Sequence, residues 1–117
     1  MSTEAIDLND VLERVQGDRE LLVELFDIYV PDSEGKIKGL NEAVKNKEYE
    51  KIKSLAHSLK GASGNISAKK LQASFLKIEE LGKTQDLSNA WEILSEIENQ
   101  FFEVKAYITK FKTEANK

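Results

Sequence analysis

The sequence predicts an all-α fold: an up-down antiparallel four-helix bundle with a short additional N-terminal helix. Apolar residues recur at spacings of three and four along nearly the whole chain, which is the helical period. One proline and six glycines in 117 residues leave few interruptions. Four long helical segments joined by short polar turns are typical of such a bundle. No segment shows the alternation of a strand.

The first segments of the chain contain a short and a long predicted helix. The short helix is expected around residues 8 to 15, ended by Gly17. The second segment begins near Asp18, whose side chain can cap it, and its apolar residues continue to Val44. Pro31 is expected to kink or divide this segment, because proline removes a backbone donor and clashes with the preceding turn.

Three further helices are expected in the second half of the chain. One runs from about residue 47 to residue 64 or 66. The next starts near Ser67, a good capping residue, and stops at Gly82. The last begins after Asp86 and is amphipathic throughout. Its apolar stripe comprises Leu87, Trp91, Leu94, Ile97, Phe101, Val104, Ile108 and Phe111.

Length and composition indicate one soluble domain over residues 1–117. No apolar run reaches the roughly 20 residues of a membrane span, and the acidic N-terminus lacks the features of a signal peptide. Cysteine is absent, which excludes disulfides and thiolate metal sites. The net charge of −4 argues against a nucleic-acid partner. We therefore expect a cytoplasmic protein, a monomer, that meets other proteins and no membrane.

His57 is the one histidine of the chain, and it falls within the third long segment. On a helical wheel with about 100° per residue, the core-facing residues of this segment lie opposite it: Leu55, Leu59, Ala62 and Ile66. His57 is therefore expected at the surface. An exposed neutral imidazole is a nucleophile near neutral pH.

Lys60, Gly61 and Gly64 share the face of His57 on the same wheel. A lysine there could offset the charge of a phosphoryl group on the imidazole, and Lys53, one turn earlier, could add to the positive field. Each glycine costs a helix about 1 kcal/mol relative to alanine, and two on one face would let a partner approach. This pattern favours a phosphoryl-carrying histidine. The alternative of an ordinary surface histidine with solvated lysines stays open at this point.

Residues 56 to 82, AHSLKGASGNISAKKLQASFLKIEELG, resemble the signature of histidine-phosphotransfer (HPt) domains of bacterial-type phosphorelays. The residues that carry the resemblance are His57, Lys60, Gly61, Ala62, Ser63, Gly64, Leu71, Ile78 and Glu79. The early stretch LNDVLERVQGDRELLVELF and the long final helix are also usual in that family.

The resemblance implies a role for each residue of the core motif. His57 would be the phosphoacceptor through its Nε2, Lys60 the cation that stabilises the phosphoryl group, and Gly61 the residue that leaves room. Glu79 matches a position whose side chain bonds the other ring nitrogen, which would fix the tautomer and leave the Nε2 lone pair free.

Other residues are expected to form the docking surface. Gln72 and Lys83 fall on the side of Glu79, and Lys53 and Gly64 lie on the histidine's helix. The implied partners are the receiver domains of response regulators and a sensor or hybrid histidine kinase. Exposed apolar residues of the early segments are expected either to join this surface or to cover one end of the bundle: Ile6, Leu8 and Val11.

The chain is expected to be a carrier and not an enzyme, with no cofactor and no metal. It has no glycine-rich ATP loop and no GxxxxGK[ST] sequence. A bundle di-metal site needs Glu-x-x-His pairs on facing helices, which one histidine cannot supply. The alternative function is a four-helix docking module that binds receiver domains without phosphorylation.

Overall fold

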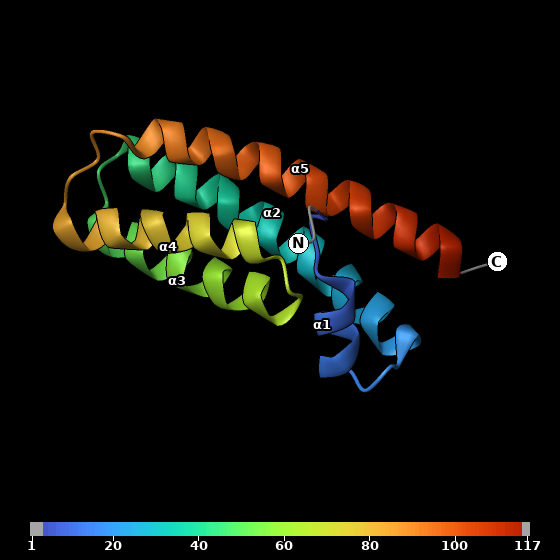
Figure 1. The fold of residues 1–117 in the computed structure, drawn as a ribbon. Coiled ribbons are helices and arrows are strands. Elements are labelled where there is room, and N and C mark those ends of the chain that lie inside the picture. The colour runs from blue at the N-terminus through green and yellow to red at the C-terminus, as the bar shows by residue number, and fades with distance from the viewer. Residues whose placement is uncertain (1–3, 116–117) are drawn as a thin grey trace.

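The computed structural model describes residues 4–115, and every regular element in that range is a helix. The helices are α1 (Leu8–Arg14), α2 (Arg19–Lys45), α3 (Tyr49–Asn65), α4 (Lys69–Thr84) and α5 (Ala90–Ala115). The four long helices run alternately up and down (Figure 1). The predicted antiparallel four-helix bundle with a short N-terminal helix is confirmed.

The four bundle helices come in two lengths. α2 and α5 have 27 and 26 residues, whereas α3 and α4 have 17 and 16. At about 1.5 Å per residue the longer pair spans roughly 40 Å and the shorter pair roughly 25 Å. α2 and α5 therefore extend past the ends of α3 and α4, and α1 lies at that end of the bundle (Figure 1).

α1 is tied to the turn between α3 and α4 by polar contacts. Asp7 caps α1 by accepting from the backbone N–H of Asp10, and its own N–H donates to the carbonyl of Ser67 at 3.0 Å. The Ser67 hydroxyl donates to the Asp10 carboxylate, and the Lys69 ammonium donates to Asp7 at 3.0 Å. These contacts close the end of the bundle at which the shorter helices stop.

The apolar residues of the N-terminal segment belong to the core. Ile6 and Val11 are fully buried, and Leu8 is half-buried. The expectation that these residues cover one end of the bundle is confirmed. The alternative expectation, that they form part of an exposed docking surface, is wrong.

α2 begins where the sequence predicts it and continues through its proline. The Asp18 side chain accepts from the backbone N–H of Leu21 at 3.0 Å, so the predicted cap is confirmed. Pro31 lies inside the continuous helix, which excludes a division there. Its ring is exposed to solvent, where the helix can tolerate the one missing hydrogen bond without losing core packing.

The predicted cap at Ser67 is wrong. Ser67 adopts a left-handed conformation with φ of 60° and precedes Ala68, the residue that caps α4 without a side-chain bond. The sequence could not show that the hydroxyl of Ser67 is taken by Asp10, 57 residues away along the chain.

The predicted stop at Gly82 is also wrong. α4 continues to Thr84 and ends at Gln85, which takes the left-handed conformation with φ of 60°. A Cβ atom at Gly82 would lie 3.1 Å from the backbone nitrogen of Lys53 and 3.2 Å from the carbonyl oxygen of Tyr49. The glycine therefore allows α4 to pack closely against α3.

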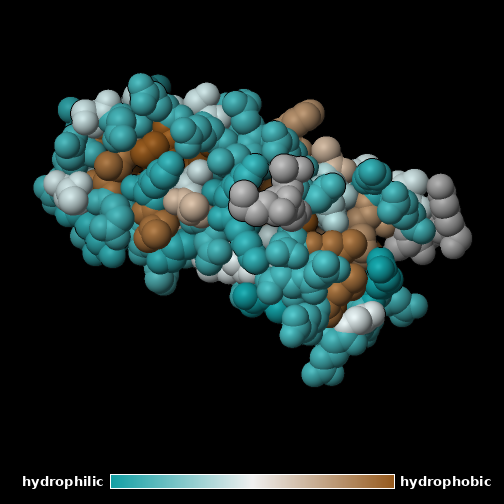
Figure 2. All heavy atoms as spheres, viewed as in Figure 1, coloured by the Kyte–Doolittle hydropathy of each residue, from teal (hydrophilic) through white to brown (hydrophobic). Residues whose placement is uncertain are grey.

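The core is apolar and continuous, and the predicted stripe of the last helix needs two corrections. α5 begins at Ala90, so Leu87 precedes the helix, and its side chain is only half-buried. Trp91 is 56% exposed, because it lies roughly 100° around the helix from the centre of the buried stripe. The buried apolar residues of α5 are Ala90, Ile93, Leu94, Ile97, Phe101, Val104, Ile108 and Phe111. Hydrophilic residues dominate the face seen in Figure 2, with apolar atoms visible mainly between the helices. Among residues 4–115, no helix is long and apolar enough to cross a bilayer.

Candidate functional site

His57 lies in the middle of α3 with its side chain 69% exposed, so the predicted surface position is confirmed. The residues that anchor α3 in the core are fully buried: Ile52, Ala56 and Leu59. Their spacing of three and four residues holds one face of the helix inward. The imidazole therefore projects from a well-packed helix, which restricts its backbone while leaving the ring open to solvent.

A carboxylate from the neighbouring helix holds the ring. Glu79, on α4, places Oε2 2.9 Å from Nδ1 of His57. An ionised carboxylate can only accept hydrogen bonds, so in the neutral ring Nδ1 carries the hydrogen and donates. Nε2 is then the nitrogen with the free lone pair.

The same carboxylate binds Lys60. The Lys60 ammonium donates to Oε1 of Glu79 at 2.6 Å, so the two oxygens serve one donor each. The Glu79 side chain is only 6% exposed, and that of Lys60 is 26% exposed. The Lys60 hydrogen bond lowers the pKa of Glu79, opposed by burial and assisted by the His57 hydrogen bond. Glu79 is therefore a buried, charged acceptor between two donors of α3.

Gly61 leaves open space beside this cluster. A Cβ atom built there would meet no neighbouring atom within 4 Å, and its backbone does not have a positive φ. Glycine in a helix interior costs about 1 kcal/mol relative to alanine. Packing within the described chain gives no reason for a glycine here, unlike Gly82.

Gly64 and Gln72 lie against each other across the α3–α4 interface. A Cβ atom at Gly64 would fall 2.5 Å from the side-chain nitrogen of Gln72. Two predicted docking residues are thus adjacent, although one stands on each helix. Gly64 does not end its helix, since α3 continues to Asn65 and Ile66 caps it.

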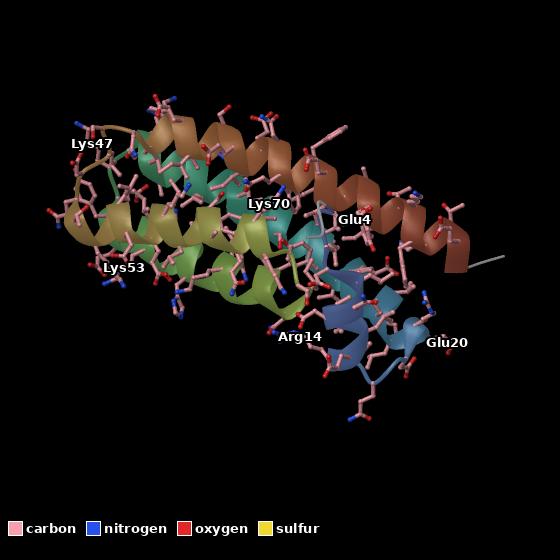
Figure 3. All side chains as sticks on the ribbon, in the orientation of Figure 1. Glu4, Arg14, Glu20, Lys47, Lys53 and Lys70 are labelled. Atoms are coloured by element: carbon pink, nitrogen blue, oxygen red, sulfur yellow. The ribbon has the colours of Figure 1, made fainter. Side chains whose placement is uncertain are left out.

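The remaining predicted docking residues are lysines that pair within their own helices. Lys53 lies 3.2 Å from Glu50, and Lys83 lies 3.3 Å from Glu80. Figure 3 shows Lys53 on the outer side of α3, pointing away from the bundle. These lysines flank the site without taking part in the Glu79 contacts.

Lys36 of α2 is a further cation, which the sequence did not predict, and it contacts the residue that follows His57 in the chain. Its ammonium donates to the hydroxyl of Ser58 at 2.9 Å and lies 3.0 Å from the carboxylate of Asp32. The spacing of four residues between Asp32 and Lys36 could have signalled their pairing. The contact with α3 could not be seen, because it depends on the register between two helices.

The described residues hold no group of three or more metal-ligating side chains. What the site offers is an oriented, exposed imidazole. An antiparallel bundle that presents such a histidine on its second long helix defines the class of helical histidine-phosphotransfer domains. The model of the Hpt domain family matches residues 24–112, and the chain belongs to this family. The predicted family is confirmed.

A solved structure has the same fold. The chain is similar to histidine-containing phosphotransfer protein B (HptB) from Pseudomonas aeruginosa PAO1, with a TM-score of 0.89 and 23% sequence identity. The similarity covers 97% of this chain and 98% of the other. No curated protein sequence matches this chain significantly. Family membership supports a histidine-phosphotransfer carrier in phosphorelays, and proteins of this class act as carriers rather than enzymes and meet kinases and receiver domains.

Proposed function

We propose that this chain accepts a phosphoryl group on Nε2 of His57 and transfers it to or from the aspartate of receiver domains. The observation that carries the proposal is the contact between Nδ1 of His57 and the buried Glu79 carboxylate, which leaves Nε2 as the nucleophile. A sensor or hybrid histidine kinase would stand upstream of this exchange.

The transfer would form one bond and break one. The Nε2 lone pair forms an N–P bond while the O–P bond of the partner's aspartyl phosphate breaks, and its electron pair leaves with the aspartate carboxylate. Because Nδ1 keeps its hydrogen, the phosphorylated ring gains positive charge. Glu79 lies 2.9 Å from that nitrogen and would offset the charge. Such a step depends mainly on alignment and charge compensation.

Gly61 and the surrounding surface would receive the partner. The open space at Gly61 would let the partner's phosphoryl site come close to His57. We assign Lys53, Gly64, Gln72 and Lys83 to the rim of the docking surface. The exposed large apolar residues of these helices are Leu76 on α4, which is 44% exposed, and Leu21 and Ile28 on α2, which are 40% and 67% exposed.

We further propose that the carrier works as a monomer in the cytoplasm, as a single domain over residues 1–117, without a cofactor. The sequence reasoning assigned Lys60 directly to the phosphoryl group. That role stays a prediction, since its partner in the unphosphorylated protein is Glu79.

The test is phosphorylation of one residue. Incubation with a phosphorylated receiver domain should give the protein an acid-labile, base-stable phosphate, and His57→Gln should take up none. The substitution should leave the thermal midpoint almost unchanged, because the side chain is 69% exposed. Label retained by His57→Gln would overturn the assignment.

A binding measurement separates the alternative function. A docking module would bind the receiver domain equally well as wild type and as His57→Gln, and neither protein would take up phosphate. A labelled wild type with an unlabelled variant that still binds would support the carrier.

A further inference from the structure

The outer face of α5 carries the most exposed large apolar side chain among residues 4–115. That residue is Phe102, which is 70% exposed. Ala106 and Thr109 follow it at spacings of four and three residues, so they share its face of the helix, and both are exposed. An exposed ring contributes little to the packing of its own bundle, and exposed apolar surface is typical of interaction sites.

Two shallow hollows adjoin this ring. One is lined by Ala5 and Glu103, and the other by Lys105 and Thr109. Both extend over the small side chain of Ala106, which is common to their linings. The outer face of α5 therefore presents a projecting aromatic ring and, beside it, open surface against which a second ring could pack.

Two charged residues on this face have no charged partner. Glu103 lies three residues before Ala106 and Lys110 four residues after it, and at about 100° per residue both fall on the same flank of the helix. Among residues 4–115, neither of them makes an ion pair. Lys105, on the opposite flank, is already bound by Glu34 of α2 at 3.0 Å. One free acidic group and one free basic group are thus placed almost evenly about Ala106.

We propose that the outer face of α5 binds a second copy of this chain, with the two α5 helices antiparallel and a two-fold axis near Ala106. This axis reverses the direction of the helix but keeps each flank facing the same flank of the other copy. Glu103 of each copy therefore meets Lys110 of the other, which gives two identical ion pairs. Phe102 of each copy packs on the hollow beside Ala106 of the other. The face is then complementary to itself in shape and in charge, as a two-fold interface requires.

This pairing leaves both histidines open. α5 packs chiefly against α2 and α4, and it lies across the bundle from α3 (Figure 1). The His57 side chain, on α3, is 69% exposed on the far side from the proposed interface. Transfer would still need only one chain, so the monomeric carrier proposed above is unchanged and the pair adds to it at high concentration. The inference goes beyond the proposed function and does not depend on it.

The test measures the mass of the full chain in solution as its concentration rises. One face of one helix makes a small interface, so half of the chains should be paired at a concentration on the order of 100 µM. Light scattering or sedimentation should show the average mass rising from that of one chain toward that of two. A mass that stays at one chain up to about 1 mM would overturn the inference.

Phe102→Ser and Trp91→Ser form a matched pair of variants. Both residues are exposed aromatics on the same face of α5, three turns apart. α5 ends nine residues after Ala106, so the helix of the second copy reaches back only to position 97 and does not cover Trp91. Phe102→Ser should weaken association at least about tenfold, because a central aromatic residue carries much of the binding energy of an interface. Trp91→Ser should change it less than about twofold.

Equal weakening by the two serine variants would contradict the proposed interface. Both should keep the thermal midpoint of wild type, because the side chains they replace are 70% and 56% exposed. A variant that fails to associate while its midpoint is unchanged has therefore lost the interface and not the fold.

Charge reversal tests the antiparallel arrangement. Glu103→Lys and Lys110→Glu, each alone, should weaken self-association about tenfold, because like charges then meet twice in each pair. An equal mixture of the two variants should associate as tightly as wild type, since every facing charge in a mixed pair is opposite. A mixture that associates no better than either variant alone would overturn the two-fold pairing.

Discussion

Two polar contacts of α3, one with α4 and one with α2, are of opposite kinds. Toward α4 and solvent, His57 and Lys60 share the charged carboxylate of Glu79. Toward α2, the buried hydroxyls of Tyr29 and Ser63 bond to each other at 2.7 Å. The first contact is charged and lies at an edge that a partner can reach, and the second is neutral and enclosed.

This difference separates reactivity from stability on one helix. Neutral hydroxyls can be buried once they are paired, whereas charges are tolerated more easily where part of the cluster meets water. Two glycines show a similar contrast between packed and open positions: Gly82 of α4 is crowded by α3, and Gly61 of α3 faces open space. Substitutions on the inner side should therefore change stability, and those on the outer side should change transfer.

Leucine placed at each of these two glycines gives the largest expected contrast. Gly82→Leu should lower the free energy of unfolding by about 3 kcal/mol, because its Cβ already approaches the backbone of Lys53 and Tyr49. Gly61→Leu should leave stability unchanged or raised, and should slow transfer on the order of 100-fold by keeping the partner away. Urea unfolding and transfer rates measure the two effects.

The two leucine variants control for each other, since each adds the same side chain to one of two adjacent helices. A large loss of stability in Gly61→Leu would show that the outer side is packed after all. Normal transfer in that variant would remove Gly61 from the docking surface.

The inner hydroxyl pair predicts that wild type is more stable than Tyr29→Phe at neutral pH and less stable at high pH. Burial raises the pKa of Tyr29 to about 12, although the Ser63 hydroxyl bond lowers it. Below about pH 10 the tyrosine is neutral in both folded and unfolded chains, and Tyr29→Phe should cost about 1 kcal/mol for the lost hydrogen bond. Above pH 10 the tyrosine ionises more readily in the unfolded chain than in the folded one. The free energy of unfolding of wild type should therefore fall by about 2 kcal/mol by pH 12, and that of Tyr29→Phe should not show this loss.

Unfolding curves of wild type and Tyr29→Phe between about pH 9 and 12 test whether the order of their stabilities reverses. Deprotonation of the lysines affects both proteins alike, so the difference between them isolates Tyr29. A constant difference across this range would show that Tyr29 ionises as easily in the folded chain as in the unfolded one.

The smallest effect concerns the helical cost of Gly61. Gly61→Ala should raise the free energy of unfolding by about 0.5–1 kcal/mol, because alanine favours the helix and nothing within 4 Å obstructs its Cβ. Thermal unfolding measures the gain. A loss of stability would indicate a packing reason for this glycine and weaken its assignment to docking.

The sequence predicted what depends on local pattern. Periodicity placed the four long helices and the outward position of His57, and the Asp18 cap follows from residue type and position. The errors arose where contacts with residues distant in the sequence determine what a residue does. Ser67 resembles a cap, but its hydroxyl serves Asp10, and the packing role of Gly82 depends on the approach of α3.

For the candidate site, the sequence predicted which residues take part better than it predicted the contacts between them. The helical wheel grouped the residues on the helix of His57. The Glu79 position came from a resemblance to a family, and the family match confirmed that family. No spacing rule could show that Lys60 binds Glu79, because the two residues lie on different helices. Nor could it show that Trp91 lies outside the stripe, since a helical period leaves the limits of a buried face undefined.

The contacts of Glu79 also bear on the order of folding. They link residues only 22 and 19 positions apart, within one helix–turn–helix unit. The bonds that attach α1 to the turn and α2 to α5 join residues 57 and 85 positions apart. Closing a short loop costs less chain entropy, and local contacts favour rapid folding. We therefore expect the α3–α4 hairpin to assemble early, with the orientation of its histidine set before the two ends of the chain are brought together.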